Sequence, residues 1–355
     1  MENVAFTARN SVKKDLNIPA GENGIEIFSS KLLAKDEAIF IGRKDFSGVP
    51  LNHYYISRSD AQMESVLEHS GISASLISRI ILSSRQEGRT KKFPLPKIMA
   101  VANATPDSFY PGSRLDNGHE MLDRIIAAEP DIIDVGGEST RPGSQEISTR
   151  EEIERIAPVI EYILDKTNIP ISLDTRHPDV LEHFAGKVQY ANDISGFQDE
   201  RMIRISAEHS LSCITMHMRG KPGTMQSMTH YVDLIPEILS FLLESAAKLE
   251  EGGIEGNKVI IDPGIGFSKD FGGNLEILKE IESFRLGYEI LVGASRKSFI
   301  GKITGEETQG RLPGTLAVTT YLAMKGVDLI RVHDPKENLQ AIKVVNSIVN
   351  YGNQL

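Results

Sequence analysis

The chain has no tryptophan, one cysteine among 355 residues, and no apolar run near the ~18 residues that a membrane span needs. A single cysteine excludes internal disulfides and thiolate clusters, and Cys213 lies in an apolar run that favours an inert, buried thiol. The amino terminus lacks the apolar core of a signal peptide, so we expect a cytoplasmic protein. A formal charge of −10 disfavours non-specific nucleic-acid binding. We expect neither a nucleic-acid nor a membrane partner.

Eight short runs rich in Ile and Val are present instead, and each is too short for a helix. Stretches with helical spacing separate them, such as 150–166 and 231–252. This alternation predicts right-handed βαβ units and a parallel sheet. The expected strands are 97–103, 131–137, 170–175, 190–195, 213–218, 258–264, 290–295 and 329–334.

Eight such units in about 250 residues predict an α/β fold of the (β/α)8 TIM barrel class, whose active sites lie at the carboxyl ends of the strands. Polar and chemically capable residues follow the expected strands at those ends. A purely structural distribution would place them at both ends. The candidates are Asn103, Asp134, Asp174, Asn192, Met216, His217, Asp262, Ser295, Arg331 and His333.

The length exceeds one barrel, so we expect a barrel domain at 91–355 and a small α/β or α+β accessory domain at 1–90. The charged, proline-containing stretch 87–97 is the best linker candidate. Within the accessory domain, 24–33, 37–46 and 52–58 resemble two or three strands, and 60–71 and 73–88 have helical spacing.

Two glycine-containing loops are candidate anion sites. The loop 136–144 presents Thr140 and Arg141, and the loop 293–301 presents Ser295, Arg296 and Lys297 where a helix should begin. Arg331 and His333 have the i, i+2 spacing that places two side chains on one face of a strand. Arg331 is therefore a candidate for ring stacking and phosphate contact.

A second set of candidates lies deeper. Asp174, Asn192 and Asp262 should converge with Lys297, and such a set matches the donor and acceptor edge of a flat nitrogen heterocycle. An internal salt-bridge cluster is the structural alternative. Ile214, Met216 and Phe267 are candidates for an apolar wall or for ordinary packing. For magnesium, which takes oxygen ligands, we assign Asn103 and Asp116.

The chain resembles dihydropteroate synthase in a series of motifs that run in the family's order from residue 97 to about 351. The motifs are NATPDSF, IIDVGGESTRPGS, SLDT, NDIS, TMHM, DPGIGF, SRKSFIG, RLPGTLA and RVHD. The resemblance implies condensation of a 6-hydroxymethyl-7,8-dihydropterin diphosphate with para-aminobenzoate, with Mg²⁺ bound beside the diphosphate. It also implies a homodimer formed through the last two helices.

The resemblance also implies roles for individual residues. Asp174, Asn192, Asp262 and Lys297 would hold the pterin, and Arg331 would cover its ring. Arg331, His333, Asn103 and Arg141 would meet the diphosphate, and Asn103 and Asp116 would hold the metal. Thr140, Pro142 and Ser295 would frame the aminobenzoate, while Asp134 would support the loops. The residues that would shape the pterin slot are Ile194, Ile214, Met216, Phe267 and Gly293.

The chain departs from the family in its first loop, NATPDSFYPGSRLDNG, where NVTPDSFSDGG is usual, and in its longer amino-terminal segment. Two other functions stay open from the residues. One is methyl transfer from methyltetrahydrofolate in a similar barrel, and the other is a non-catalytic pterin-binding or partner-binding protein. The first has no need of the STRPG, SRKS and RVHD motifs.

Overall fold

The computed structural model describes residues 95–104, 115–139, 146–285 and 287–351, with residues 115–118 described in backbone only. It also describes the backbone of four strands between residues 4 and 56. The helices expected at 60–71 and 73–88 lie outside the described residues, as does the linker candidate up to residue 94. No described helix has the length and apolar character to cross a membrane.

Eight parallel strands close into a barrel, which confirms the TIM-barrel prediction. Consecutive strands pair with one another, and the last pairs with the first through Leu329 opposite Lys97. Every expected run overlaps one strand. The strands are β5 (Lys97–Asn103), β6 (Ile132–Gly136), β7 (Ile171–Asp174), β8 (Tyr190–Asp193), β9 (Ser212–Met216), β10 (Val259–Asp262), β11 (Glu289–Val292) and β12 (Leu329–Val332).

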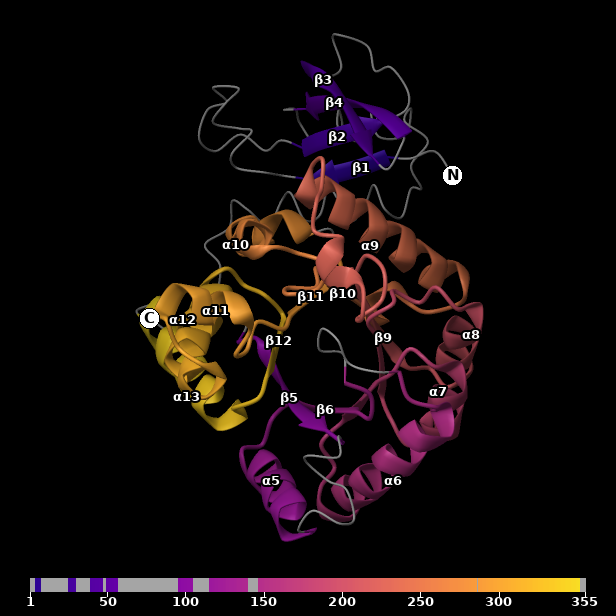
Figure 1. Cartoon of the computed structure of the whole chain (residues 1–355), viewed down its shortest axis with the longest axis vertical. Coiled ribbons are helices and arrows are strands. Elements are labelled where there is room, and N and C mark those ends of the chain that lie inside the picture. Colours follow the sequence, from indigo (N-terminus) through magenta and orange to yellow (C-terminus); the bar gives the residue numbers. More distant parts are fainter. Residues whose placement is uncertain are drawn as a thin grey trace. The chain divides into compact units, whose positions relative to one another are not determined.

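Helices follow the strands, and those labelled α5 to α8 and α11 to α13 lie outside the strand ring (Figure 1). The expected helix 150–166 is α6, whose start is stabilised because Ser148 caps the backbone N–H of Glu151. The expected helix 231–252 is α9. The helices are α5 (Leu115–Ala127), α6 (Thr149–Lys166), α7 (Pro178–Phe184), α8 (Glu200–Glu208), α9 (Leu234–Glu251), α10 (Phe271–Lys279), α11 (Ser298–Thr304), α12 (Leu312–Met324) and α13 (Pro335–Val349).

The barrel interior is filled by a layer of apolar side chains drawn from six strands. Each of these side chains is nearly or fully buried, and Tyr190 packs against them. Burial of this layer removes apolar surface from water, which stabilises the fold by about 25 cal/mol per Å². The layer leaves the carboxyl ends of the strands free for polar residues. The layer consists of Met99, Ile132, Ile214, Ile260, Leu291 and Leu329.

The amino-terminal segment contains a four-stranded antiparallel sheet in the order β1-β2-β4-β3. Its strands are β1 (Val4–Thr7), β2 (Ile25–Ser29), β3 (Ile39–Phe46) and β4 (Val49–Ile56). Three of them fall at the expected positions. The expectation of two or three strands missed β1, because four residues give too short a pattern to recognise.

The chain separates into two compact units. One contains residues 1–92, 230–244 and 275–288, and the other contains 93–229, 245–274 and 289–355. The second unit holds all eight barrel strands. A domain division at residue 90 stays a prediction.

A tight turn after β10 joins the barrel to the loop that follows. Gly264 in this turn has a φ of +71°, and a Cβ atom at this position would overlap the carbonyl oxygen of His217 and lie 3.0 Å from Nζ of Lys269. Both the left-handed backbone and the close approach therefore require glycine. The turn holds the loop from β10 directly against the end of β9.

We expect Gly264→Ala to lower the free energy of unfolding by about 2–4 kcal/mol, because backbone strain and overpacking add. Gly186→Ala is the matched control, since a Cβ atom there would meet nothing within 4 Å. That change should alter stability by about 0.5 kcal/mol or less. Urea denaturation of both variants measures the difference. Equal midpoints would show that the turn tolerates a side chain.

Candidate active site

The carboxyl ends of the strands carry the expected polar residues. Asp174 is the last residue of β7 and pairs in register with Asn192 of β8, while Asp262 is the last residue of β10. Asn103 ends β5, and Arg331 lies one residue before the end of β12. The barrel therefore gathers side chains that are far apart in sequence at one face.

Arg331 forms the central ion pairs of this face. Its Nε donates to Oδ2 of Asp134 over 2.6 Å, and its Nη2 donates to Oδ2 of Asp174 over 2.7 Å. Asp134 is fully buried and also accepts the amide N–H groups of Asn192 at 3.3 and 3.4 Å. Asp134 thus binds the guanidinium from below and aligns Asn192, consistent with the expected supporting role.

Burial raises the pKa of Asp174 above its ordinary value. Arg331 opposes that shift, while the nearby carboxylates of Asp134, Glu152 and Asp193 reinforce it. Losing Arg331 without a replacement donor would leave a buried, unpaired carboxylate, which is costly. Any ligand that displaces the guanidinium must supply N–H groups of its own.

Asp262 and Lys297 form the second charged part of the site. One oxygen of Asp262 accepts the N–H of Gly264 over 2.7 Å, and burial raises the pKa of this carboxyl while Lys297 opposes the shift. Burial also lowers the pKa of Lys297 to about 8, against the attraction of Asp262. The Lys297 ammonium donates to the carbonyl of Ile265 and lies 4.7 Å from the Phe267 ring centroid.

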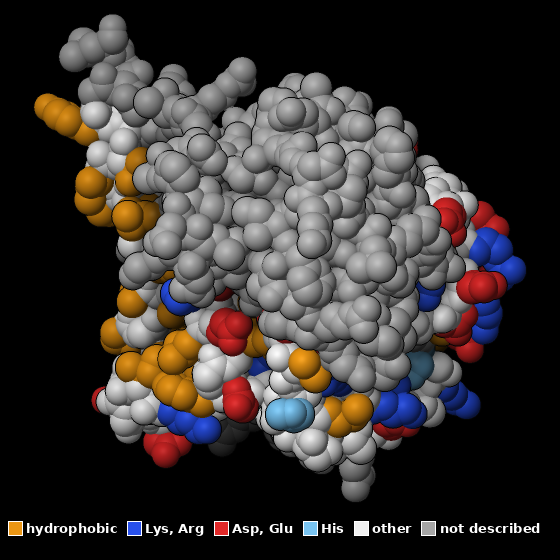
Figure 2. Space-filling view, turned by 90° about the horizontal axis from the view of Figure 1, so that it is seen from above, with side chains coloured by type: hydrophobic (Ala, Val, Ile, Leu, Met, Phe, Trp, Pro, Cys, Tyr) orange, Lys and Arg blue, Asp and Glu red, His pale blue; other side chains and the backbone are white. Residues whose placement is uncertain are grey.

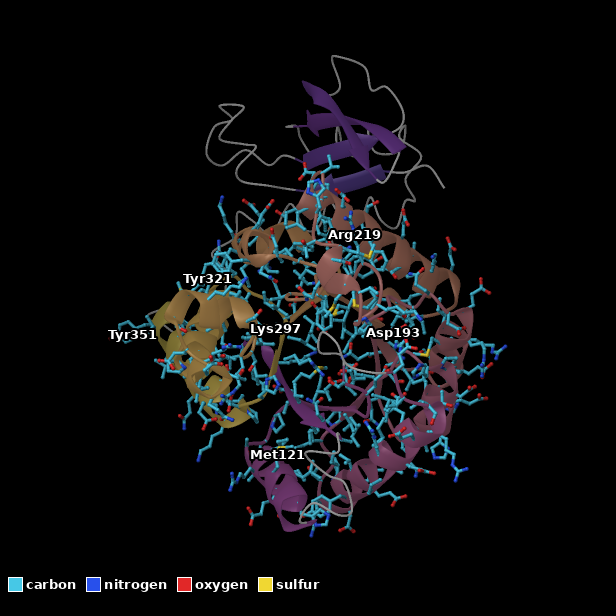
Figure 3. The ribbon with its side chains drawn as sticks, in the orientation of Figure 1. Met121, Asp193, Arg219, Lys297, Tyr321 and Tyr351 are labelled. Carbon is cyan, nitrogen blue, oxygen red and sulfur yellow. The ribbon has the colours of Figure 1, made fainter. Side chains whose placement is uncertain are left out.

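Lys297 immediately precedes α11 and lies near the centre of the barrel in Figure 3. The backbone of Gly293 lies beside it, since a Cβ atom at Gly293 would stand 3.9 Å from Nζ of Lys297 and 3.7 Å from Cβ of Arg331. Gly293 therefore leaves room between these two cations.

Apolar side chains line one side of the charged residues. Ile194 and Met216 cluster with Met218 and Met225, and Phe267 packs against this group. Three of the expected wall residues are thus brought together. Ile214 is placed differently, in the apolar layer that fills the barrel interior.

Ser295 and His333 lie side by side at the mouth. The Ser295 hydroxyl lies 3.1 Å from Nδ1 of His333 and accepts its backbone N–H over 3.3 Å. The pKa of His333 is lowered to about 4, first by desolvation and then by the charge of Arg331, with Arg296 and Lys297 adding to the effect. The imidazole is neutral near pH 7.

The guanidinium of Arg296 is engaged in contacts within the protein. It forks onto both carboxylate oxygens of Asp334 at 2.8 and 2.7 Å, and it donates to the carbonyls of Thr308 and Gln309. Of the two cations expected to attract an anion at the start of α11, Lys297 alone points toward the pocket residues.

Sequence reasoning missed Lys269, which is buried beneath the pocket. Its Nζ lies 2.8 Å from Nδ1 of His217 and donates to the His217 carbonyl over 2.9 Å. Burial lowers the pKa of both groups well below their ordinary values. A hydrogen-bonded pair of Lys269 and His217 therefore joins the loops after β9 and β10. The available signal was the lysine that ends the DPGIGFSK motif, two residues after Phe267.

Three predicted site residues, Thr140, Arg141 and Pro142, lie outside the described residues. Asp116 lies in the first turn of α5 without a described side chain. Among the described residues, no group of three or more His, Cys, Asp or Glu side chains is placed to hold a metal.

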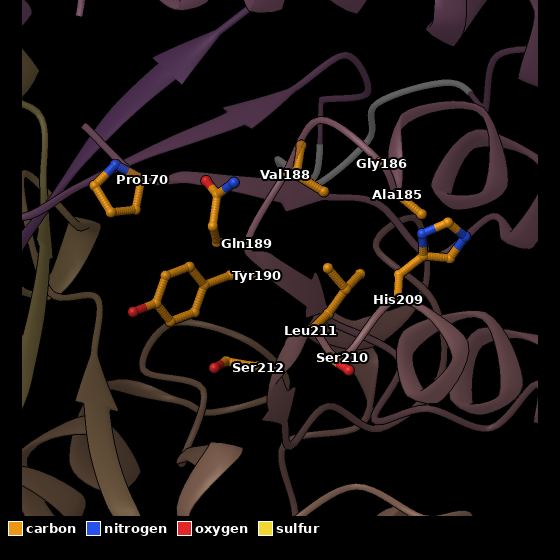
Figure 4. A pocket seen from close by; sticks show the side chains of 10 residues that line it. All are labelled: Pro170, Ala185, Gly186, Val188, Gln189, Tyr190, His209, Ser210, Leu211 and Ser212. Carbon is orange, nitrogen blue, oxygen red and sulfur yellow. The ribbon is translucent and has the colours of Figure 1, made fainter. Parts of the chain in front are cut away.

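A hollow of about 520 Å³ opens at the opposite end of the barrel (Figure 4). Residues that begin or precede β7, β8 and β9 line it, among them Pro170, Tyr190 and Ser212. None of the expected site residues lines this hollow. The chemistry therefore concentrates at the carboxyl ends of the strands.

A family model for pterin-binding enzymes matches residues 99–333. The dihydropteroate synthase of Escherichia coli strain K12 is 38% identical over 270 residues, which are 74% of this chain and 95% of that protein. The chain belongs to the dihydropteroate synthase family. The resemblance read from the sequence motifs is thereby confirmed.

Solved structures of the dihydropteroate synthase family share the fold. One from Clostridium difficile, determined in the presence of pteroic acid, has a TM-score of 0.67 and 37% identity over 72% of this chain and 97% of that chain. One from Xanthomonas albilineans with 4-aminobenzoic acid has a TM-score of 0.67 and 32% identity over 72% of this chain and 94% of that chain.

The pKa of His333 provides a test of the geometry at the mouth. We expect Arg331→Gln to raise this pKa toward the ordinary 6.5, because the variant removes the largest opposing charge. NMR titration of the imidazole C2 proton measures it. Because the pKa of His333 is lower in the folded than in the unfolded protein, the folded state loses stability as pH falls from about 6.5 toward 4. An unchanged pKa would contradict the proximity of the two groups.

Proposed function

We propose that this chain is a dihydropteroate synthase, a transferase of folate biosynthesis. It joins para-aminobenzoate to the methylene carbon of 6-hydroxymethyl-7,8-dihydropterin diphosphate and releases pyrophosphate. The observation that supports this function best is the convergence of Asp174, Asn192, Asp262 and Lys297 beside an apolar wall, in a barrel of this family. The substrates are small molecules, as in the relatives crystallised with pteroic acid and 4-aminobenzoic acid.

The side chains of this site match the polarity of a pterin. The carboxylates of Asp174 and Asp262 accept ring and amino N–H groups, and Asn192 can both donate and accept. Lys297, with its pKa lowered to about 8, donates to ring oxygen or nitrogen acceptors. Ile194, Met216 and Phe267 contribute an apolar surface against a flat ring, with Ile214 beneath them and Gly293 beside them.

Binding of the pterin exchanges one partner of Asp174 for another. Arg331 now occupies one oxygen of Asp174, and the N–H groups of the ring replace its donation. The released guanidinium is then available to cover the ring and to meet the diphosphate. Because the carboxylate is never left unpaired, the exchange avoids most of the cost of a buried charge.

The leaving group is an anion, so catalysis depends on stabilising its growing charge. Arg331, His333, Asn103 and Arg141 are the groups that we assign to the diphosphate. The ring of His333 donates to phosphate oxygens, and its Nδ1 is oriented by the Ser295 hydroxyl.

Mg²⁺ is the cofactor that the family implies, and oxygen donors suit it. Asn103 at the end of β5 and Asp116 in the first turn of α5 are the residues that we assign to it. When bound, the ion neutralises charge on the diphosphate.

The transfer itself requires no strong general base. The carbon–oxygen bond to diphosphate breaks, and the dihydropterin delocalises the positive charge left at the methylene carbon. The arylamine nitrogen then attacks this carbon, and its proton leaves for solvent or pyrophosphate. Thr140, Pro142 and Ser295 frame the aminobenzoate for this attack. A free, reduced Cys213 suits the cytoplasm, where we expect the enzyme to act.

The deciding experiment is pyrophosphate release by the purified protein with dihydropterin diphosphate and Mg²⁺, with and without para-aminobenzoate. Dihydropteroate formed in equal amount to pyrophosphate supports the proposal. Saturable pterin diphosphate binding without turnover indicates a binding protein. Methyl transfer from methyltetrahydrofolate to a corrinoid indicates the methyltransferase.

Removing the Asp262 carboxylate should weaken pterin binding by about 100-fold or more, because two hydrogen bonds to a charged group are lost. Calorimetry with a pterin ligand on Asp262→Ala measures the loss. Glu289→Ala is a matched control, since Glu289 pairs with Lys97 on the exposed surface and begins β11. Unchanged affinity in Asp262→Ala would refute the assigned pterin contact.

We also propose a homodimer formed through α12 and α13. Their exposed apolar residues include Met324, Val344 and Ile348, which retain 52%, 61% and 69% of their surface. Hydrophobic side chains gather in Figure 2 on the left, the side on which these helices lie in Figure 1. Apolar area of this kind favours association with another surface.

The double change Val344→Glu and Ile348→Glu should convert the dimer to a monomer, because it places two like charges in each half of the interface. Light scattering coupled to gel filtration gives the mass. The control Leu164→Glu, at an exposed apolar residue of α6, should leave the mass unchanged. A dimer that persists in the double variant would exclude this interface.

A further inference from the structure

The loop between β10 and α10, residues 263–270, carries part of the proposed pterin site. Asp262 is the last residue of β10 and leads directly into this loop. Phe267 packs against the apolar side chains of the site, and the carbonyl of Ile265 accepts a hydrogen bond from the ammonium of Lys297. The path of this loop therefore decides where several groups around the ring lie.

Lys269 connects the loop to the end of β9. Its Nζ donates to the carbonyl of His217 over 2.9 Å and lies 2.8 Å from Nδ1 of the same residue. The N–H of His217 donates to the carbonyl of Asp262 over 3.0 Å, so His217 continues the pairing of β9 with β10. Beside this contact, the Ser268 hydroxyl accepts the N–H of Arg219 over 3.0 Å. Two adjacent residues of the loop thus bind the segment after β9.

Asn274 of α10 binds the other side of the loop. Its Oδ1 accepts the N–H of Gly266 over 2.6 Å, and its amide donates to the carbonyl of Asp270 over 2.6 Å. Asn274 is 4% exposed, so a backbone group that lost this partner would be unsatisfied and shielded from water. Gly266 lies against Lys297, since a Cβ atom there would be 3.0 Å from Cδ of that lysine. The loop is therefore fixed from both β9 and α10.

Burying an amine at position 269 is costly. Lys269 is 3% exposed, and burial lowers its pKa well below the ordinary value while Asp262 opposes the shift. An apolar side chain of similar length would fill the same space without that cost. The contacts with His217 are what the lysine adds, and they hold the loop at the strand that pairs with Asp262.

We propose that Lys269 and Asn274 are positioning residues of the pterin site, which hold the loop 263–270 between β9 and α10 and thereby place Asp262 and Phe267 against the ring. This inference rests on the proposed function, because it takes Asp262 and Phe267 as pterin contacts. The residues that we assign to the aminobenzoate belong to other loops. A displaced loop should therefore weaken the pterin more than the aminobenzoate.

Calorimetry with a pterin ligand on Lys269→Met tests this role, because methionine fills similar space without a donor. We expect the affinity to fall about tenfold or more, since small displacements of binding groups are costly. The KM for para-aminobenzoate at saturating pterin diphosphate should stay within about twofold. A partly unfolded sample would instead bind fewer pterins per chain, whereas a displaced loop lowers the affinity of folded molecules.

Lys258→Met is the matched control. Lys258 directly precedes β10 and donates to the carbonyl of Ser210 over 3.1 Å, so it also links the segments beside β9 and β10, but at the opposite end of the barrel. The control should leave pterin affinity unchanged. Asn274→Ala should weaken the pterin as Lys269→Met does, and it keeps the test open if Lys269→Met does not fold. An equal loss in the control, or unchanged affinity in a folded loop variant, would overturn the proposal.

Hydrogen exchange separates this inference from the proposed function. The peptide covering residues 262–272 should exchange faster in Lys269→Met than in Lys258→Met or in the unchanged protein. If the unchanged protein binds pterin but makes no dihydropteroate, the proposed function fails and calorimetry still decides the role of Lys269. If it makes dihydropteroate and Lys269→Met binds pterin with unchanged affinity, the proposed function stands and the positioning role is wrong.

Discussion

The balance of buried charge at the carboxyl ends of the strands is the constraint on which the site depends. Asp134, Asp174 and Asp262 are removed from water there, and burial of a carboxylate is costly unless a cation or several N–H groups compensate. Arg331 and Lys297 provide that compensation. The barrel can accommodate these buried charges because its apolar layer, not these residues, stabilises the fold.

The same charge balance prepares the site for chemistry. A flat heterocycle rich in N–H groups can replace Arg331 on Asp174 without leaving a bare charge, so the resting ion pairs mimic the polarity of the pterin. Desolvation and then the charge of Arg331 lower the pKa of His333 to about 4, so its imidazole is neutral near pH 7. We expect an arriving diphosphate to oppose the charge of Arg331, so that the imidazole gains a proton more readily and the site becomes more positive when its anionic substrate is present.

Sequence pattern was sufficient for the features that repeat or that end a strand. The position of Arg331 in the last short apolar run predicts its place at the barrel face, and helical spacing alone predicts α6. Lys269 could not be found this way, because its burial and its contact with His217 depend on groups from distant elements. Ile214 shows the same limit of sequence pattern. Its alternation with Met216 predicts the face of the strand on which it lies, but not its depth along the barrel axis.

Long-range polar contacts were the part least accessible from sequence. Arg176 meets Glu138 across 38 residues and is an unremarkable charge in a loop until the barrel brings β6 and β7 together. Beside the apolar cluster that contains Met216 and Phe267, this face carries the charged and polar groups that polar substrates need. Rigid loops here must therefore rely on charge-assisted bonds, and arginine suits that task because its planar fork serves two carboxylates at once. A face built for polar substrates thus has to be held in shape by polar contacts as well, and the fork of Arg176 on Glu138 is one of them.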